Sequence, residues 1–512
     1  MKKISIIIFL GLLIYSFGLF NGFVWDDEVM FQKAASISNT VYFRPAISAV
    51  YLTIYNVFGP RPFFFHFFQL IFHITTAVLI YYLFRRFFKE TISLILAIIF
   101  LVHPANVEAV SFASAMQEVV FTLTGIIGLY LFVSSENLSI TKIFLSTALL
   151  LIALLMKETA IVFFVLVFFY LLLFKKNNRA VLISYSIFAV ILLMIYFLFR
   201  LSGGNLYVQG QGLFPIMRVP LAIRLINIPV IILYYLSKFF LPLNLGIAQH
   251  WVINSISFNN FFLPLILEIL FFLSAVIYSI KKKNKIFALF FIWFVLGLLP
   301  HLQIIPLNMT VAERWLYFPM IGLLGMMGAI IKISNIKNQI SKVLLSFAIV
   351  VITIFSVRSF VRSLDWRNGL SLFGHDIKKT SSFDLQNNFG VELFRIGRYN
   401  EAKKYFEIST KLAPYWWVNW NNLGAIYERE KNYQKAADYY QKSINNGQYY
   451  LAYENLAKIL VLYSNDQKKT EEFLQKSLNI FPGNENLLRI STFYREKISP
   501  GSSNVNKEIE NN

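Results

Sequence analysis

Three acidic residues, Asp26, Asp27 and Glu28, follow the first apolar stretch of the chain and come directly after Trp25. Charged groups beside the core of a bilayer are costly, and they are candidates for function for that reason. Carboxylates so close together also raise the pKa of one of them, which suits a general base. The segment therefore predicts a catalytic base, and it leaves open whether Asp26 or Asp27 has that role.

Basic residues occur at similar boundaries of apolar stretches. Arg44 precedes Pro45 in the same loop, Lys157 interrupts a long apolar run, and Arg314 opens a late apolar stretch. Side chains of this kind can bind a phosphate or another anion. Two of them also have a non-catalytic interpretation: Arg44 could bind lipid head groups, and Lys157 could form a neutral structural pair with an acidic neighbour. Other polar residues at such boundaries are His103, Glu108, Glu158 and Glu313.

The composition decides the class of protein. Of 512 residues, 57% are hydrophobic and 14% are charged, whereas soluble domains carry roughly 25% charged residues. This excludes a soluble cytosolic enzyme, a disordered protein and a collagen-like fibre, and it predicts a polytopic membrane protein.

The chain has no cysteine, which excludes disulfides, Cys-ligated zinc and iron–sulfur clusters. The net charge of +20 is expected from loops that stay cytoplasmic, and not from nucleic-acid binding.

The apolar stretches predict an all-α helix bundle in the membrane. The first is 4–20, interpreted as an uncleaved span with its amino end inside. Basic clusters follow several of the others, and all clusters fall inside only if 223–241 does not cross simply. That topology has about 11 spans, and 46–58 is expected to lie in the outer interface. The further stretches are 64–84, 91–102, 106–133, 141–156, 158–174, 180–199, 258–280, 286–300, 315–331 and 343–357.

A repeat with a period of 34 residues occupies the carboxyl-terminal part. Gly390 and Gly424 are one period apart, and so are Phe406 and Tyr440. Small residues alternating with aromatics at this period are typical of tetratricopeptide repeats. We expect a transmembrane domain over 1–360, a linker over 361–382, about three repeats and a capping helix over 383–496, and a disordered tail over 497–512.

Several short motifs occur in an order that resembles a known family. They are FVWDDE (23–28), YFRP (42–45), HPANVEAV (103–110), MKETAIV (156–162), AERWLYFP (312–319) and DWRNGLSLF (365–373), and the repeats follow them. This order is similar to the transmembrane-and-tetratricopeptide O-mannosyltransferases and their bacterial relatives, which belong to the GT-C glycosyltransferases. The chain thus resembles a GT-C-type bundle followed by a tetratricopeptide α-solenoid.

The resemblance implies an inverting sugar transfer from a polyprenyl-phosphate donor, with mannose as the sugar and a protein Ser or Thr hydroxyl as the acceptor. The acidic pair Asp26-Asp27 would then be catalytic. The lipid phosphate would be held by Arg314, Lys157, Arg44 and His103, with Glu108, Glu158 and Glu313 supporting the acceptor or the site. No metal is expected, although Asp26, Asp27 and Glu28 could hold a divalent ion. The resemblance also implies a multi-pass plasma-membrane protein whose repeats bind the acceptor protein on the extracytoplasmic side.

One segment departs from these relatives, and two other classes of function compete. Where relatives carry Gly-Arg-Ala-Asp, this chain has Ala115-Met116-Gln117-Glu118, so the acceptor or the sugar can differ. An O-antigen ligase or polymerase would place its key residues in a large late external loop, which is absent between 300 and 315. A non-enzymatic scaffold would use only the repeats. Inverted repeats of spans, typical of transporters, are not seen.

Overall fold

The computed structural model describes residues 2–38, 43–175, 179–202, 212–333 and 338–498. The chain divides into two compact units, Met1–Thr380 and Ser381–Asn512. The described residues are helical, with one isolated β-bridge between Gln249 and Val311. The all-α fold class predicted from the sequence is confirmed, and the tail expected over 497–512 falls almost entirely outside the described residues.

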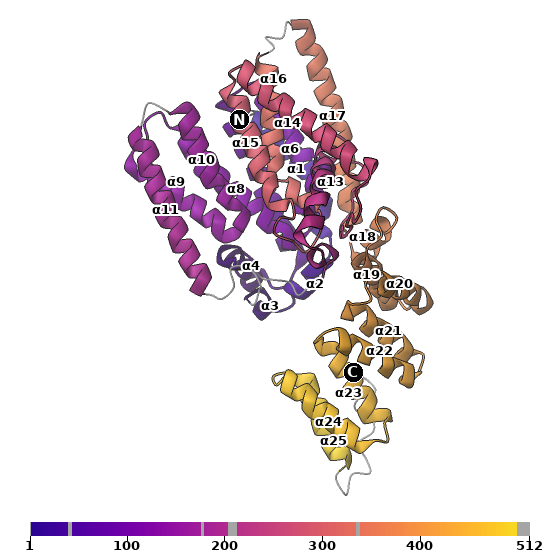
Figure 1. The fold of residues 1–512 in the computed structure, drawn as a ribbon. Helices are drawn as coiled ribbons and strands as arrows, with labels where there is room; N and C mark the ends of the chain where they lie inside the picture. Colours follow the sequence, from indigo (N-terminus) through magenta and orange to yellow (C-terminus); the bar gives the residue numbers. More distant parts are fainter. Residues whose placement is uncertain (1, 39–42, 176–178, 203–211, 334–337, 499–512) are drawn as a thin grey trace. The chain divides into compact units, whose positions relative to one another are not determined.

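Long apolar helices build the first unit (Figure 1). By length and composition, seven segments of the described chain can cross a membrane, or eight if the bent pair α6 and α7 forms one span. Five shorter apolar helices accompany them. These helices are α1 (Lys2–Tyr15), α4 (Pro45–Phe58), α5 (Pro62–Arg85), α6 (Glu90–Val102), α7 (Val107–Ser111), α8 (Met116–Ser134), α9 (Ile140–Met156), α10 (Ile161–Phe174), α11 (Arg179–Ser202), α13 (Leu221–Phe240), α14 (Leu263–Lys281), α15 (Lys285–Leu298), α16 (Pro319–Ile333) and α17 (Asn338–Asp365).

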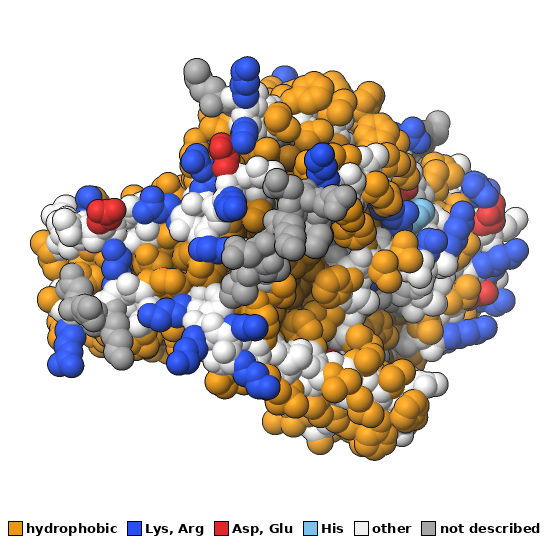
Figure 2. All heavy atoms as spheres, turned by 90° about the horizontal axis from the view of Figure 1, so that it is seen from above, with side chains coloured by type: hydrophobic (Ala, Val, Ile, Leu, Met, Phe, Trp, Pro, Cys, Tyr) orange, Lys and Arg blue, Asp and Glu red, His pale blue; other side chains and the backbone are white. Residues whose placement is uncertain are grey.

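Basic residues gather at one end of this unit, which we call the basic end. The start of α1, the ends of α5, α8, α10 and α16 and the starts of α6 and α15 lie there. Figure 2 looks onto this end and shows many Lys and Arg side chains with few acidic ones. Cytoplasmic loops of membrane proteins are enriched in Lys and Arg. A concentration of these residues at one end of the bundle is therefore typical of a protein with a fixed orientation in the membrane.

Both ends of α13 are hydrogen-bonded to segments at the end of the unit that lies opposite the basic end. We call this opposite end the site end. Near its start, Arg224 donates to the carbonyl of Ile304 at 3.3 Å, in the connection after α15. At its other end, the carbonyl of Phe239 lies 3.0 Å from Nε2 of His103, directly after α6. By length and composition α13 is still among the seven segments that can cross a membrane, so the expectation that 223–241 does not cross simply stays a prediction.

Short helices and helix breaks form the site end. Helices α2 (Asp26–Met30), α3 (Ala34–Ser38) and α4 (Pro45–Phe58) lie there between α1 and α5. His103 ends α6 because a residue before proline is disfavoured in the helical conformation, and its ψ is 125°. Lys157 is also extended, between α9 and the short 3-10 turn that precedes α10. The candidate residues His103 and Lys157 thus lie where helices are interrupted.

The end of the first unit is closed by a buried ion pair. Arg362 on α17 donates two hydrogen bonds to Asp376, at 2.7 and 2.8 Å, on α18 (Gly369–Asp376). Asp376 also accepts a hydrogen bond from the backbone of Ile247 at 2.9 Å. Most of the stretch expected as a linker, 361–382, therefore packs into the first unit.

Paired helices stack in the second unit. The pairs are α19 (Phe383–Arg395) with α20 (Tyr399–Leu412), α21 (Trp417–Arg429) with α22 (Tyr433–Asn446), and α23 (Tyr450–Tyr463) with α24 (Gln467–Ile480), and α25 (Glu485–Ile498) follows them. A Cβ on Gly424 would come within 2.5 Å of the Tyr440 ring, and one on Gly390 within 2.7 Å of the Phe406 ring. The 34-residue alternation of glycine and aromatic thus lets the two helices of each pair approach closely.

We expect Gly322→Ala to destabilise the first unit. A Cβ at this position would lie 2.5 Å from the backbone nitrogen of Phe294 and 2.8 Å from the carbonyl oxygen of Phe290. Since backbone atoms cannot move aside as a side-chain tip can, the cost should be about 1–3 kcal/mol. The melting temperature of the detergent-solubilised protein checks this. Gly18→Ala is the control, because only Asn21 lies near it, at 3.6 Å; equal melting temperatures for both variants would contradict the packing.

Candidate active site at the site end

Asp27 is a buried carboxylate that joins two segments far apart in the sequence. It is fully buried, and its oxygens accept hydrogen bonds from the backbone nitrogens of Ala113 at 3.1 Å and Ser114 at 2.7 Å. The Ser114 hydroxyl donates to it as well, at 2.5 Å. Tyr51 on α4 donates to the carbonyls of Ala113 and Ser114, both at 3.1 Å. The first loop is thereby fixed to the break between α7 and α8.

The two neighbouring aspartates have different environments. Asp26 is exposed, whereas burial raises the pKa of Asp27 to about 7 in spite of its hydrogen bonds to Ser114 and Ala113. Trp25, which caps α2, has a φ of 57° and stacks on Phe112 with ring centroids 5.4 Å apart. Such a backbone conformation is costly for a residue with a side chain and persists only where the surroundings impose it. The stacked tryptophan turns the chain so that Asp27 points inward and Asp26 remains accessible.

Arg314 is held by a buried carboxylate. Its guanidinium forms an ion pair with Glu108, and its backbone nitrogen donates to the other oxygen of the same group at 2.9 Å. Burial alone would lower the pKa of Arg314, but the charges of Glu108, Glu118 and Asp26 raise it. Asp26 is therefore within electrostatic reach of Arg314.

Lys157 forms a second buried ion pair, with Glu118 on α8. The two side chains are 7% and 3% exposed, so neither has water to stabilise its charge. Lys157 also interacts electrostatically with Arg44 and Arg314. The three cations that the sequence singled out thus lie in one region, although they come from three separate parts of the chain.

Arg44 belongs to a third ion pair, with Glu158. Its guanidinium donates to Glu158 at 2.8 and 2.9 Å, and to the side-chain oxygen of Gln117 at 2.6 Å. Glu158 also pairs with Arg200, at the end of α11, at 3.1 Å. This is the most open part of the cluster, because the Glu158 side chain is 31% exposed.

Two of the predicted residues have other partners. His103 is fully buried, and its ring nitrogens lie 3.0 Å from the carbonyl of Phe239 and 3.2 Å from the amide of Ala105. Neither nitrogen is directed at the cations. Glu313 accepts a hydrogen bond from the amide of Gly246 at 2.6 Å, and burial raises its pKa above the ordinary range. Together with Asp376 on the next amide, Glu313 fixes the loop after α13.

Sequence reasoning did not select several residues that complete this region. They are Arg200 and Gln117, which contact the Arg44–Glu158 pair, Tyr51 and Ser114, which contact the break before α8, and Arg362 with Asp376. Arg200 ends a long apolar stretch, which is the same signal that marked Lys157 and Arg314. Gln117 and Glu118 stand where the resemblance led us to expect other residues, and here both contact a cation.

The arrangement suits the transfer of a group from a phosphate. Four cations with carboxylate partners belong to this region, and one of them, Arg314, interacts electrostatically with the exposed Asp26. Cations placed beforehand stabilise negative charge that develops on a leaving group. In the described ranges, no group of three or more His, Cys, Asp or Glu side chains is placed to hold a metal ion.

Comparison with known proteins agrees with the motifs. Residues 45–201 match the family model described as dolichyl-phosphate-mannose-protein mannosyltransferase. Residues 383–415 and 417–446 each match a tetratricopeptide repeat. No curated protein matches the chain. The resemblance read from the sequence is thus confirmed: the chain combines a region similar to the membrane mannosyltransferases with tetratricopeptide repeats. Lys157, Glu158 and Arg200 lie within the matched region, and Asp26 and Arg314 lie outside it.

We expect the stability of the protein to depend on the ionisation of Asp27. Its pKa is raised by burial from 3.8 to about 7 in the folded protein. The folded state therefore retains a proton that the unfolded state has lost, and the free energy of unfolding falls as the pH rises between these two values. The loss is about 4 kcal/mol at most. Melting temperatures measured across this range should decrease for the wild type and decrease less for Asp27→Asn.

Asp26→Asn is the matched control for that measurement, because Asp26 is exposed and its charge is the smallest of the causes that raise the pKa of Asp27, so most of the pH dependence of the wild type should remain. An unchanged slope in Asp27→Asn would contradict the assignment.

Removal of one partner of the Arg314–Glu108 pair should cost more than removal of both charges. Arg314→Ala leaves a buried carboxylate without its cation, which costs about 3–5 kcal/mol. In the double variant Glu108→Gln/Arg314→Ala the remaining group is neutral and can still accept from the backbone nitrogen of residue 314. The double variant should therefore melt at a higher temperature than Arg314→Ala. A lower melting temperature for the double variant than for Arg314→Ala would contradict this explanation, because the unpaired Glu108 carboxylate would then not be the main source of the lost stability.

Proposed function

We propose that this protein is an integral-membrane glycosyltransferase that moves a sugar, mannose, from a polyprenyl-phosphate donor to a Ser or Thr hydroxyl of a protein. The observation that carries the proposal is the gathering of Arg44, Lys157 and Arg314 near the exposed Asp26. The match of residues 45–201 to the mannosyltransferase family supports the class of donor.

Asp26 is the proposed base. The acceptor hydroxyl attacks the anomeric carbon of the sugar, and its proton passes to the Asp26 carboxylate. The bond between the anomeric carbon and the phosphate oxygen breaks as the new bond forms on the opposite face, so the configuration is inverted. Asp27 does not contact the substrate in this mechanism. It positions Asp26 by fixing α2 to Ala113 and Ser114.

Arg44, Lys157 and Arg314 hold the leaving polyprenyl phosphate. Each is already paired with a glutamate, namely Glu158, Glu118 and Glu108. These carboxylates supply most of the opposing charge before the donor arrives, and they fix the positions of the cations. A preorganised site costs little reorganisation at the moment of reaction. Arg200, the second partner of Glu158, extends the cation cluster toward the end of α11.

The basic end is proposed to face the cytoplasm, in accord with the positive-inside rule. The site end then faces away from the cytoplasm, and the donor is a lipid-linked sugar because nucleotide sugars are not available there. The chain leaves α17 at the site end, since Asn21 after α1 donates to the carbonyl of Ser363 at 3.2 Å. The repeats that follow are therefore proposed to be extracytoplasmic and to bind the acceptor protein.

Replacement of Asp26 should abolish sugar transfer without unfolding the protein. Purified wild type receives radiolabelled polyprenyl-phosphate mannose and a membrane protein extract, and the label on protein is counted. Loss of a general base lowers the rate roughly 100-fold to 10,000-fold, so Asp26→Asn should transfer almost no label while its melting temperature stays that of the wild type.

Glu28→Gln is the matched control, because it removes a carboxylate from the same short helix and should keep its activity. Equal transfer by Asp26→Asn and the wild type would reject Asp26 as the base. No transfer by the wild type under these conditions would reject the proposed donor, and the scaffold interpretation would then be favoured.

A further inference from the structure

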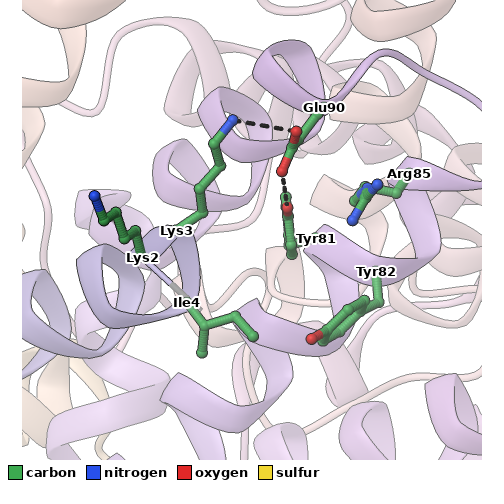
Figure 3. A pocket seen from close by; sticks show the side chains of 7 residues that line it. All are labelled: Lys2, Lys3, Ile4, Tyr81, Tyr82, Arg85 and Glu90. Carbon is green, nitrogen blue, oxygen red and sulfur yellow. Dashed lines mark hydrogen bonds and ion pairs between the residues drawn. The ribbon is translucent and has the colours of Figure 1, made fainter.

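A cavity of about 300 Å³ opens at the basic end, away from the proposed active site (Figure 3). It lies where α1 and α6 begin and α5 ends. Three basic side chains, two tyrosines and one carboxylate line it: Lys2, Lys3, Arg85, Tyr81, Tyr82 and Glu90. In Figure 3, Lys2 lies on one side of the group and Arg85 on the other, with Tyr81 between them.

The single carboxylate of this cavity is already occupied. Glu90 forms an ion pair with Lys3 at 3.3 Å and accepts a hydrogen bond from Tyr81 at 3.0 Å. Lys2 and Arg85 form no ion pair in the described part of the chain, and the Arg85 guanidinium lies 5.8 Å from the centre of the Tyr81 ring. Three cations against one carboxylate leave the cavity with two positive charges in excess, which favours an anion.

A second cavity at the same end has cations that are already engaged. It is lined in part by Arg86 and Lys175. Arg86 donates to the carbonyl of Ser134 at 3.3 Å, and Lys175 donates to the carbonyls of Ser135 and Glu136 at 3.2 and 3.1 Å. Because Arg86 and Lys175 already donate to carbonyls at the end of α8, fewer of their hydrogen bonds remain for an anion than in the first cavity.

The position of the first cavity indicates the kind of anion. It lies at the ends of apolar helices, so a bound group would be level with the head groups of the membrane. The outer surface of α1 below it carries exposed apolar side chains, Phe9 at 62% and Leu13 at 55%, along which acyl chains can lie. Basic pockets between transmembrane helices on the cytoplasmic side suit anionic lipid head groups, and tyrosines are favoured at this depth.

We infer that the cavity formed by Lys2, Lys3, Tyr81, Tyr82, Arg85 and Glu90 binds the phosphate head group of an anionic phospholipid. Lys2 and Arg85 contact the phosphate from opposite sides. Lys3 is held by Glu90 and shapes the wall of the cavity. This site is independent of sugar transfer, because it lies at the other end of the bundle.

Lipid binding by the purified full-length protein tests the inference without an activity assay. The protein, stripped of lipid in a neutral detergent, is titrated with phosphatidylglycerol, phosphatidylcholine or inorganic phosphate, and bound molecules are counted by native mass spectrometry. Phosphatidylglycerol should bind most tightly. Lys2→Gln/Arg85→Gln should weaken it about 30-fold, the factor for two cations that contribute ~1 kcal/mol each.

The control variant Lys281→Gln/Lys282→Gln removes the same charge at the basic end, where α14 ends and α15 follows, but outside both cavities. It should bind phosphatidylglycerol as the wild type does. Equal binding by the two double variants would overturn the proposed site. Binding of inorganic phosphate or phosphatidylcholine as tight as that of phosphatidylglycerol would overturn the assignment to an anionic lipid. Melting temperatures confirm that both variants are folded.

Discussion

The hydrogen bonds that Asp27 accepts from Ala113 and Ser114 are the constraint on which the site depends. They fix a loop that follows the first helix to a break between two later helices. Asp27 is buried and holds the loop in place, whereas the neighbouring Asp26 stays exposed at a defined position. Burial of a carboxylate costs free energy because the group loses its hydration. Such costly arrangements are typical of functional regions.

Paired charges solve the related problem of keeping cations inside an apolar bundle. Three cations have their own glutamates, and each pair joins segments far apart in the sequence. A buried ion pair gains little stability over an apolar pair, because desolvation offsets the attraction. Its retention at three neighbouring positions is therefore better explained by function than by stability: the cations stay charged and in place for an anionic ligand.

The sequence predicted the elements better than the contacts. The apolar stretches and the 34-residue period predicted the helices and repeats because both patterns are local. Charge at the boundaries of apolar stretches was sufficient to find Asp26, Lys157 and Arg314. Asp26 and Asp27 were equivalent in the sequence, since only the turn at Trp25 decides which side chain points inward. Arg200 carried the same local signal, at the end of an apolar stretch, but its pairing with Glu158 and the contact of Gln117 with Arg44 depend on how distant helices pack, which no local pattern records.

The position of a bound polyprenyl phosphate is the most direct test of whether these cations hold the donor. A cryo-electron microscopy structure of the full-length protein with this lipid would locate the phosphate. We expect the phosphate at the site end, within hydrogen-bonding distance of at least two of Arg44, Lys157 and Arg314, with Asp26 facing it across the space for the sugar. A phosphate bound elsewhere, with the three glutamate pairs intact and closed, would contradict the proposal that these cations hold the donor.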